Sequence, residues 1–281
     1  MRIVSPAKIN LSLSVGPVRA DGYHEVDSFF HLISLHDILM VRPSDIFCIK
    51  SSVDLGIPEE ENLIYKAAQG MAQIYGRDLP AACFDVEKCI PHGAGLGGGS
   101  SNAAATIYAI AQLWDLELRD PRHLELAAQL GSDVPLFLAP TTASTMTGKG
   151  DILAQSHDPL PPMHLLILMP PGVYSPTGAV YQAFDNDPQP GHELGLWANN
   201  LEAAATAVSP KTGQALAWLR AQPEVDLAQV AGSGAACWAH IRADKYCADV
   251  TALSLLAQRA RSAGYDTFEA VTVENGIHII A

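Results

Sequence analysis

The sequence predicts an α+β protein of two domains, with strands and helices mixed in each half of the chain. Residues 8–15, KINLSLSV, alternate apolar and polar side chains, the period of a half-buried strand with Lys8 on its polar face. Residues 100–114, SSNAAATIYAIAQLW, are rich in alanine and predict a helix. Residues 152–162 carry three prolines and little periodicity. We therefore expect the domains to meet near residue 158, as 1–157 and 158–281.

Local patterns predict the other elements of the first domain. After the turn RADGY at 19–23, residues 24–43 predict one or two strands. Residues 58–75 predict a helix with acidic residues in its first turn, and residues 82–90 predict a strand.

Capping residues predict where two helices begin and end. Ser100 or Ser101 is expected to cap the alanine-rich helix. Asp120 and Pro121 are expected to open a further helix that Gly131 ends.

The second domain shows the same mixture of patterns. Its predicted helices lie at 175–184, 199–208, 212–222 and 244–263. Its predicted strands lie at 163–171, at 230–241 with a glycine loop interrupting the strand, and at 267–280.

Composition excludes several classes of function. The 281 residues carry a net charge of −13, which argues against broad binding of nucleic acid or anionic membranes. A polyanionic ligand would need local attraction from a few lysines and oriented backbone amides. No apolar run is long enough for a signal peptide or a membrane span, so we expect a cytoplasmic protein.

The cysteines and histidines show no metal-binding pattern. Five scattered cysteines lack a C-x-x-C pair, so neither a zinc site nor a disulfide framework is indicated. We expect them to be reduced and to act as small hydrophobes. They are Cys48, Cys83, Cys89, Cys237 and Cys247. The histidine spacing also predicts no protein-held transition metal.

A glycine-rich segment follows the predicted strand at 82–90. Residues 93–99 contain five glycines, and two serines follow them. Gly93, Gly95 and Gly98 match G-x-G-x-x-G, but the second strand of a dinucleotide site, which would end in an acidic residue about 20 residues on, is missing because that segment reads as helical. Gly99 stands where a P-loop would have its lysine. Backbone amides and the helix N-terminus can still hold phosphate, with a cation from elsewhere. A plain turn before a helix is the alternative.

These residues resemble a known family. PHGAGLGGGSSNAA, at 91–104, resembles the ATP loop of the GHMP kinases. Residues 6–13, 21–30, 131–138 and 231–238 are similar to further motifs of that family, in its order. The resemblance implies an N-terminal domain like ribosomal protein S5 domain 2 and a ferredoxin-like C-terminal domain. It also implies transfer of the γ-phosphate of ATP to a hydroxyl of a cytidine-diphosphate sugar alcohol, CDP-methylerythritol.

The resemblance assigns the chemistry to two residues. Asp133 would accept the proton of the substrate hydroxyl, although Asp133 could instead cap a helix. Lys8 would keep that carboxylate ionised and stabilise the attacking oxygen, although an isolated lysine on a strand is usually solvated. Asn10 shares the strand face of Lys8 and would bind substrate.

The resemblance also assigns residues to binding. Tyr23 would stack on the cytosine and His24 would hydrogen-bond its edge, with Tyr181 as a second stacking ring; ordinary turn residues are the alternative for Tyr23 and His24. A third glycine motif has Gly232, Ser233 and Gly234. The ATP loop has Pro91, His92, Gly93, Ala94, Gly95, Leu96, Gly97, Gly98, Gly99, Ser100 and Ser101.

The remaining expectations concern partners and alternatives. Mg²⁺ should enter with ATP, and the enzyme should be a monomer or a homodimer. Two functions are the alternatives to this kinase activity: a kinase of the homoserine or mevalonate type, and an inactive nucleotide sensor on the same fold. The chain departs from the family pattern at His92, Ser132, Lys149 and Asp151. Lys149 stands where an uncharged residue is more common in the family.

Overall fold

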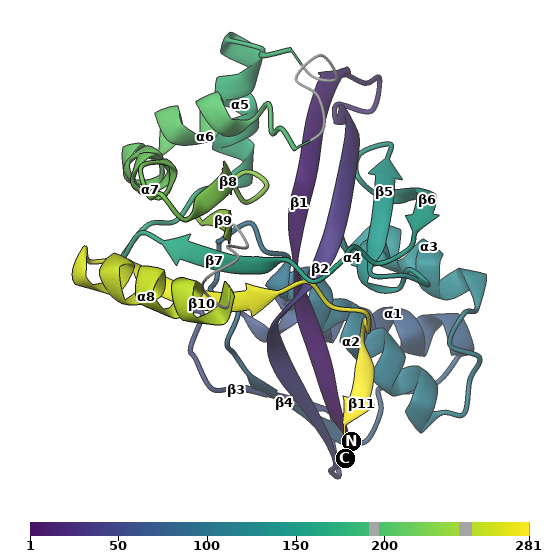
Figure 1. Ribbon diagram of the computed structural model, residues 1–281. Helices are drawn as coiled ribbons and strands as arrows, with labels where there is room; N and C mark the ends of the chain where they lie inside the picture. Colours follow the sequence, from purple (N-terminus) through teal and green to yellow (C-terminus); the bar gives the residue numbers. More distant parts are fainter. Residues whose placement is uncertain (191–196, 242–248, 281) are drawn as a thin grey trace.

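Two long strands run through the middle of the molecule (Figure 1). They are β1, Arg2–Val18, and β2, His24–Pro43, and they pair antiparallel in a computed structural model that describes residues 1–190, 197–241 and 249–280. The expected turn at 19–23 joins them. Residues 24–43 thus form one strand.

A seven-stranded sheet forms around these two strands in the described part of the chain. Its order is β11–β1–β2–β4–β3, and β5 pairs with both β2 and β6. Only the β3–β4 pair is parallel among the pairings described. The added strands are β3 Cys48–Ser51, β4 Ala82–Glu87, β5 Ala143–Thr147, β6 Ile152–His157 and β11 His278–Ile280.

Helices pack against this sheet through small and apolar side chains. Helix α2 buries Ala103, Ala104 and Ile107 in one cluster with Phe84 of the sheet and Met71 of α1. Full burial of a large apolar side chain stabilises the fold by about 1.5–3 kcal/mol, and the alanines allow close approach. The elements are η1 Glu59–Glu61, α1 Leu63–Tyr75, α2 Gly98–Leu113, α3 Pro121–Leu130 and α4 Val134–Phe137.

Two predicted helix starts were wrong, and one was confirmed. The acidic residues 59–61 form a separate 3₁₀ turn, because the Asn62 side chain caps α1 by accepting a hydrogen bond from the Ile64 N–H. Neither predicted serine caps α2, whose N-cap is Gly97 in the left-handed conformation. Helix α3 begins after its Asp120 cap and ends at Gly131, as expected.

A four-stranded sheet with the order β10–β7–β9–β8 forms in the second half of the chain. Its strands are β7 His164–Met169, β8 Val225–Val230, β9 Cys237–Ile241 and β10 Asp266–Val271. The helices beside it are α5 Thr177–Asn186, α6 Glu202–Val208, α7 Pro210–Arg220 and α8 Asp249–Ser262. Mixed helices and sheets confirm the α+β class.

Two strand predictions for the second half of the chain were wrong, and one helix prediction lies partly outside the described residues. Residues 230–241 are not one interrupted strand, because β8 and β9 pair antiparallel across the glycine loop. Residues 267–280 supply strands to both sheets, since β11 pairs with β1. The predicted helix at 244–263 is described from Asp249, and residues 244–248 lie outside the described residues. The boundary at residue 158 stays a prediction.

The two sheets share a hydrophobic cluster. Ile9 and Leu11 of β1 belong to one buried cluster with Leu165 and Ile167 of β7 and Trp238 of β9. The middle of β1 is therefore buried on both faces, whereas its alternating pattern predicted one wet face. This burial fixes the strand that carries Lys8 and Asn10. No helix in the described residues has the length and apolarity needed to cross a membrane.

The prediction that all the cysteines are reduced was wrong for one pair. Cys48 and Cys83 lie opposite each other in the parallel β3–β4 pair and form a disulfide. Strand pairing brings them together, and nothing in their sequence spacing indicates it. Cys89 and Cys237 are free thiols, and Cys247 lies outside the described residues.

Candidate active site

The glycine segment forms a loop of alternating backbone hand ahead of α2. Gly93, Gly95 and Gly97 have φ of 67°, 78° and 73°, while Ala94 and Leu96 between them have negative φ. A backbone in which φ alternates in sign can turn successive N–H groups toward one side, as in an anion-binding nest. Only glycine adopts this conformation at low cost, which explains the repeated glycines.

Neighbouring backbone holds this loop through its carbonyl groups. Ala235 N–H donates to the Gly93 carbonyl at 3.1 Å and Ala236 N–H to that of Ala94 at 3.2 Å. The Lys8 N–H donates to the carbonyl of Leu96 at 3.0 Å. Within the described part of the chain, the N–H groups of residues 93–100 donate no backbone hydrogen bond. They are available to a ligand, beside the positive end of the α2 dipole.

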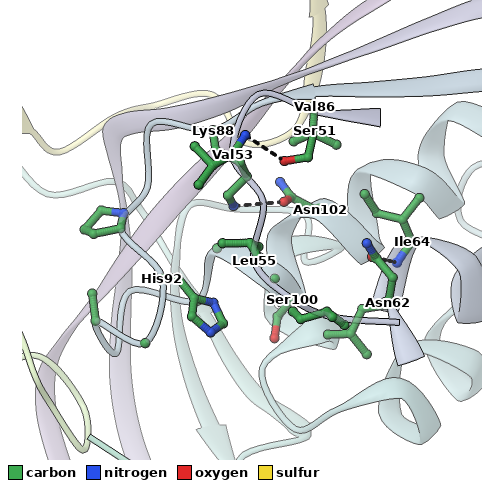
Figure 2. A pocket seen from close by; sticks show the side chains of 18 of the residues that line it. Ser51, Val53, Leu55, Asn62, Ile64, Val86, Lys88, His92, Ser100 and Asn102 are labelled. Atoms are coloured by element: carbon green, nitrogen blue, oxygen red, sulfur yellow. Dashed lines mark hydrogen bonds between the residues drawn. The ribbon is translucent and has the colours of Figure 1, made fainter. Parts of the chain in front are cut away.

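A cavity of about 600 Å³ lies against this loop and is called the loop cavity here. Its lining includes residues 91–100 together with Val53, Leu55, Asn62 and Lys88. Figure 2 shows Val53, Leu55 and Asn62 around the same space as His92 and Ser100. Apolar walls beside a row of backbone donors suit a ligand with a flat apolar part and an anionic part.

A buried polar network fixes the start of the loop. One carboxylate oxygen of the fully buried Asp37 accepts the N–H groups of Cys89 and Ile90, each at 2.8 Å. The other oxygen binds the Lys88 ammonium and the Asn102 amide. Lys88 also donates to Asn102 Oδ1 at 3.1 Å, a contact visible in Figure 2. A buried carboxylate satisfied in this way holds the loop rigidly.

The two serines of the loop have different surroundings. Ser100 lines the loop cavity and also a second cavity. Ser101 is fully buried, and its hydroxyl hydrogen-bonds that of Ser5 at 2.7 Å. Ser101 is absent from the described lining of both cavities, so the structure does not bring its side chain to the nucleotide position that the sequence predicts.

The second cavity, called the strand cavity here, has a volume of about 610 Å³. It shares Gly95, Gly97 and Ser100 with the loop cavity, so the two meet at the N-terminus of α2. All the predicted catalytic and substrate-binding residues line it, namely Lys8, Asn10, Tyr23, His24, Asp133 and Tyr181, together with Gly232 and Ser233 of the third glycine motif. Tertiary structure thus assembles residues from β1, β2, α5 and three loops.

Lys8 and Asp133 form an ion pair in the strand cavity. Lys8 Nζ lies 3.4 Å from Asp133 Oδ2 and donates to Asn10 Oδ1 at 2.8 Å. Lys8 is only 4% exposed, which excludes a solvated lysine, and its Nζ lies 5.0 Å from the Phe30 ring centroid. Asn10 is held in turn because its amide donates to the Ser28 hydroxyl at 2.9 Å. Asn10 therefore orients the lysine.

The Asp133 side chain has no capping role. Asp133 precedes the short helix α4, but its carboxylate makes no hydrogen bond to the helix. Its side chain is one-third exposed toward the cavity, and the buried Lys8 is its ion-pair partner. Burial, with a smaller contribution from the negative charge of Asp133, raises the pKa of the nearby Tyr181 to about 12. Tyr181 therefore remains a neutral phenol at pH 7.

An aromatic group lies at another part of the strand cavity. His24 is largely buried, and its Nδ1 hydrogen-bonds the Gly16 carbonyl at 2.9 Å. Its Nε2 lies 3.2 Å from Asp185 Oδ1, and its ring centroid lies 5.2 Å from that of Tyr181. Tyr23 lines the same cavity and is 54% exposed. The three rings offer apolar faces and one polar edge to a planar ligand.

The two glycine loops pack backbone against backbone. A Cβ added to Gly95 would lie far inside van der Waals contact of the Ala231 carbonyl oxygen, and 3.0 Å from that of Gly234. Asn199 holds the second loop by donating to the Gly232 carbonyl at 2.7 Å. Gly234 therefore supports the first loop and is not among the residues described as lining either cavity.

Several polar residues that line the cavities had no site role in the sequence-based prediction. Asn62 and Lys88 line the loop cavity, and Asp185 lines the strand cavity. Lys149 also lines the strand cavity. The signal for Lys149 was its departure from the family pattern; no local pattern marked the other three. Among the described residues, no group of three or more His, Cys, Asp or Glu side chains is placed to hold a metal ion.

Comparison with known proteins defines the class. Residues 62–140 match the family model described as the GHMP kinases N terminal domain. A crystal structure of homoserine kinase from Cytophaga hutchinsonii superposes with a TM-score of 0.67 over 100% of this chain and 97% of that one, at 17% identity. The chain therefore has the fold of the GHMP kinases.

More similar relatives define the family within that class. A relative from Jannaschia sp., "4-diphosphocytidyl-2-C-methyl-D-erythritol kinase", is 35% identical over 250 residues, which cover 83% of this chain and 86% of the relative. A crystal structure of "4-(cytidine 5'-diphospho)-2C-methyl-D-erythritol kinase" superposes with a TM-score of 0.77 at 30% identity, over 97% of this chain and 100% of that one. The chain belongs to the family of 4-diphosphocytidyl-2-C-methyl-D-erythritol kinases.

Proposed function

We propose that this chain transfers the γ-phosphate of ATP to the 2-hydroxyl of 4-diphosphocytidyl-2-C-methyl-D-erythritol, a step of the non-mevalonate route to isoprenoids. The observation that carries this proposal is the junction of two cavities at Gly95, Gly97 and Ser100, with the Lys8–Asp133 pair on one side. A phosphoryl group can pass between two bound molecules only where their sites meet.

ATP occupies the loop cavity in this proposal. Its phosphates lie on the free N–H groups of the loop and on the N-terminus of α2, which supply positive potential without a P-loop lysine. Its base lies between the apolar walls that include Val53 and Leu55. The γ-phosphate then points toward the strand cavity across Gly97 and Ser100.

The acceptor occupies the strand cavity. Tyr23 and Tyr181 give the cytosine stacking surfaces, and His24 gives its edge a hydrogen-bonding partner. The polyol end reaches Asp133, whose carboxylate accepts the proton of the attacking hydroxyl. The hydroxyl oxygen forms a bond to the γ-phosphorus while the bond from that phosphorus to the β-phosphate oxygen breaks, and ADP leaves.

Lys8 supplies fixed positive charge at this point. Its ammonium lies 3.4 Å from the Asp133 carboxylate, where the attacking hydroxyl would bind. Held by Asn10 at 2.8 Å, it needs little reorganisation to stabilise negative charge that develops on the transferring group.

Mg²⁺ accompanies ATP in this proposal. The Ser100 hydroxyl lies where the two cavities meet and would offer Mg²⁺ an oxygen ligand beside the phosphate oxygens, so the residues present fit the ion. When bound, Mg²⁺ neutralises charge on the phosphates. One chain lines both cavities, so the reaction needs no residue from a second subunit, and a monomer or a homodimer would serve. We place the reaction in the cytoplasm, where ATP is abundant.

ATP consumption with a panel of acceptors tests the proposal. We expect turnover with 4-diphosphocytidyl-2-C-methyl-D-erythritol and none above background with homoserine, mevalonate or galactose. Preferential turnover of homoserine or mevalonate would assign the chain to another kinase type of the same fold. ATP binding without turnover of any acceptor would support an inactive sensor.

A further inference from the structure

The strand cavity carries two lysines with different surroundings. Lys8 has a side chain 5% exposed and is enclosed by Asp133 and Asn10. The Lys149 side chain is 28% exposed, and its Nζ lies 3.8 Å from Asp151 Oδ2, at the outer limit of an ion pair. The described lining also contains Asp133 and Asp185, so its fixed carboxylates balance its lysines. An anionic ligand in this cavity finds its more accessible ammonium at Lys149.

The turn that carries Lys149 is fixed beside the aromatic group. The Val26 N–H donates to the Gly148 carbonyl at 2.7 Å, and the Gly148 N–H donates to the Glu25 carboxylate at 3.2 Å. Glu25 and Val26 directly follow His24 in β2. Lys149 Nζ itself lies 5.0 Å from the ring centroid of Tyr23. The ammonium therefore stands next to the surface on which we place the cytosine.

The turn at residues 148–150 also lies near the end of the strand cavity that contains Asp133. A Cβ added to Gly150 would contact the Ser132 side chain at 3.8 Å, and Ser132 directly precedes Asp133. Lys149 thus belongs to a turn that approaches the base-binding side at Tyr23, and its neighbour Gly150 lines the cavity together with Ser132 and Asp133. In a nucleotide-linked polyol, the diphosphate is the part between base and polyol.

We propose that Lys149 binds the diphosphate of the acceptor, an inference that rests on the proposed function. Its ammonium moves from the weak Asp151 pair to phosphate oxygens, which carry more charge and accept stronger hydrogen bonds. In a chain of net charge −13, one local cation matters because long-range attraction of a dianion is absent. Lys149 is thus a positioning residue that sets the preference for a diphosphate-bearing acceptor.

Calorimetric titration with cytidine and with CDP separates the charge of Lys149 from its contact with Tyr23. In Lys149→Met we expect the affinity for CDP to fall about tenfold and that for cytidine to change less than about twofold. Lys149→Arg should retain CDP binding within about threefold, because it keeps the positive charge. Lys211→Met is the matched control, because Lys211 is exposed on α7 and changes the net charge equally.

Three results would overturn the inference. Equal loss of cytidine and CDP binding in Lys149→Met would show that the lysine only supports the Tyr23 ring. Unchanged CDP binding in Lys149→Met, with melting curves equal to the parent, would place the diphosphate elsewhere. A parent protein that binds ATP but neither cytidine nor CDP would overturn the proposed acceptor, and the Lys149 assignment with it.

Discussion

Gly95→Ala tests whether the two glycine loops are packed as the structure shows. The added Cβ meets the backbone carbonyl of Ala231, which cannot rotate away as a side chain can. The second loop must move by more than an ångström, which breaks the bonds from Ala235 and Ala236 to the first loop, about 1 kcal/mol each. The left-handed backbone at φ 78° adds about 1–2 kcal/mol for alanine. We expect about 3–4 kcal/mol of lost folding free energy.

Gly172→Ala is the matched control for this variant. Gly172 has a similar φ of 67°, but its added Cβ would meet no atom within 4 Å, so it reports the backbone strain alone. Urea unfolding followed by circular dichroism measures both variants, and calorimetry measures ATP binding. We expect Gly95→Ala to lose about 2 kcal/mol more than the control, and to lose ATP affinity. Equal stabilities with unchanged ATP affinity would refute the packing of the two loops.

Three further predictions concern single side chains. Asp133→Asn should lower kcat about 10²–10⁴-fold while calorimetry still detects ATP, because an amide accepts no proton; turnover within threefold of the parent would exclude Asp133 as the base. His24→Ala should raise KM for the acceptor in steady-state assays and leave that for ATP unchanged; the reverse result would exchange the two sites. The His31 ring is hydrogen-bonded to the Leu32 carbonyl and to the Leu160 N–H. Burial lowers the pKa of His31, so the folded state binds fewer protons at this residue than the unfolded state does. Stability should fall as pH drops below about 6.5, and this loss should be smaller in His31→Gln, measured by urea unfolding at pH 7 and 5.

Periodicity and capping residues in the sequence predicted those strands and helices that short-range interactions determine. The alternation of residues 8–15 predicted a strand, and the Asp120 cap predicted the start of α3. The sequence could not show that the polar face of the strand is covered. Lys8 is buried because Asp133, the Phe30 ring and the first glycine loop close over it, and those residues are distant along the chain. The family resemblance supplied that pairing.

The errors arose where tertiary contacts decide between local alternatives. Ser101 is a good cap by type, but its hydroxyl instead joins a buried network with Ser5, and Gly97 is the N-cap of the helix. The acidic residues 59–61 suit a first helical turn, but Asn62 caps the helix after them. Cys48 meets Cys83 only because β3 and β4 pair in that register. For the two helix starts, the competing choices differ by about 1 kcal/mol, which one contact reverses.

The charge pattern explains how an acidic protein can hold two polyanions. The lysines that line the cavities each have a carboxylate partner: Lys8 with Asp133, Lys88 with Asp37 and Lys149 with Asp151. These pairs add little net positive charge around the loop cavity, so the attraction for the phosphates of ATP must come from oriented dipoles at short range. The unpaired N–H groups of the glycine loop and the N-terminus of α2 supply those dipoles. Because dipoles act only over a few ångströms, selectivity for ATP follows from the shape of the loop and not from the charge of the whole protein, whereas Lys149 supplies the local charge that we assign to the diphosphate of the acceptor.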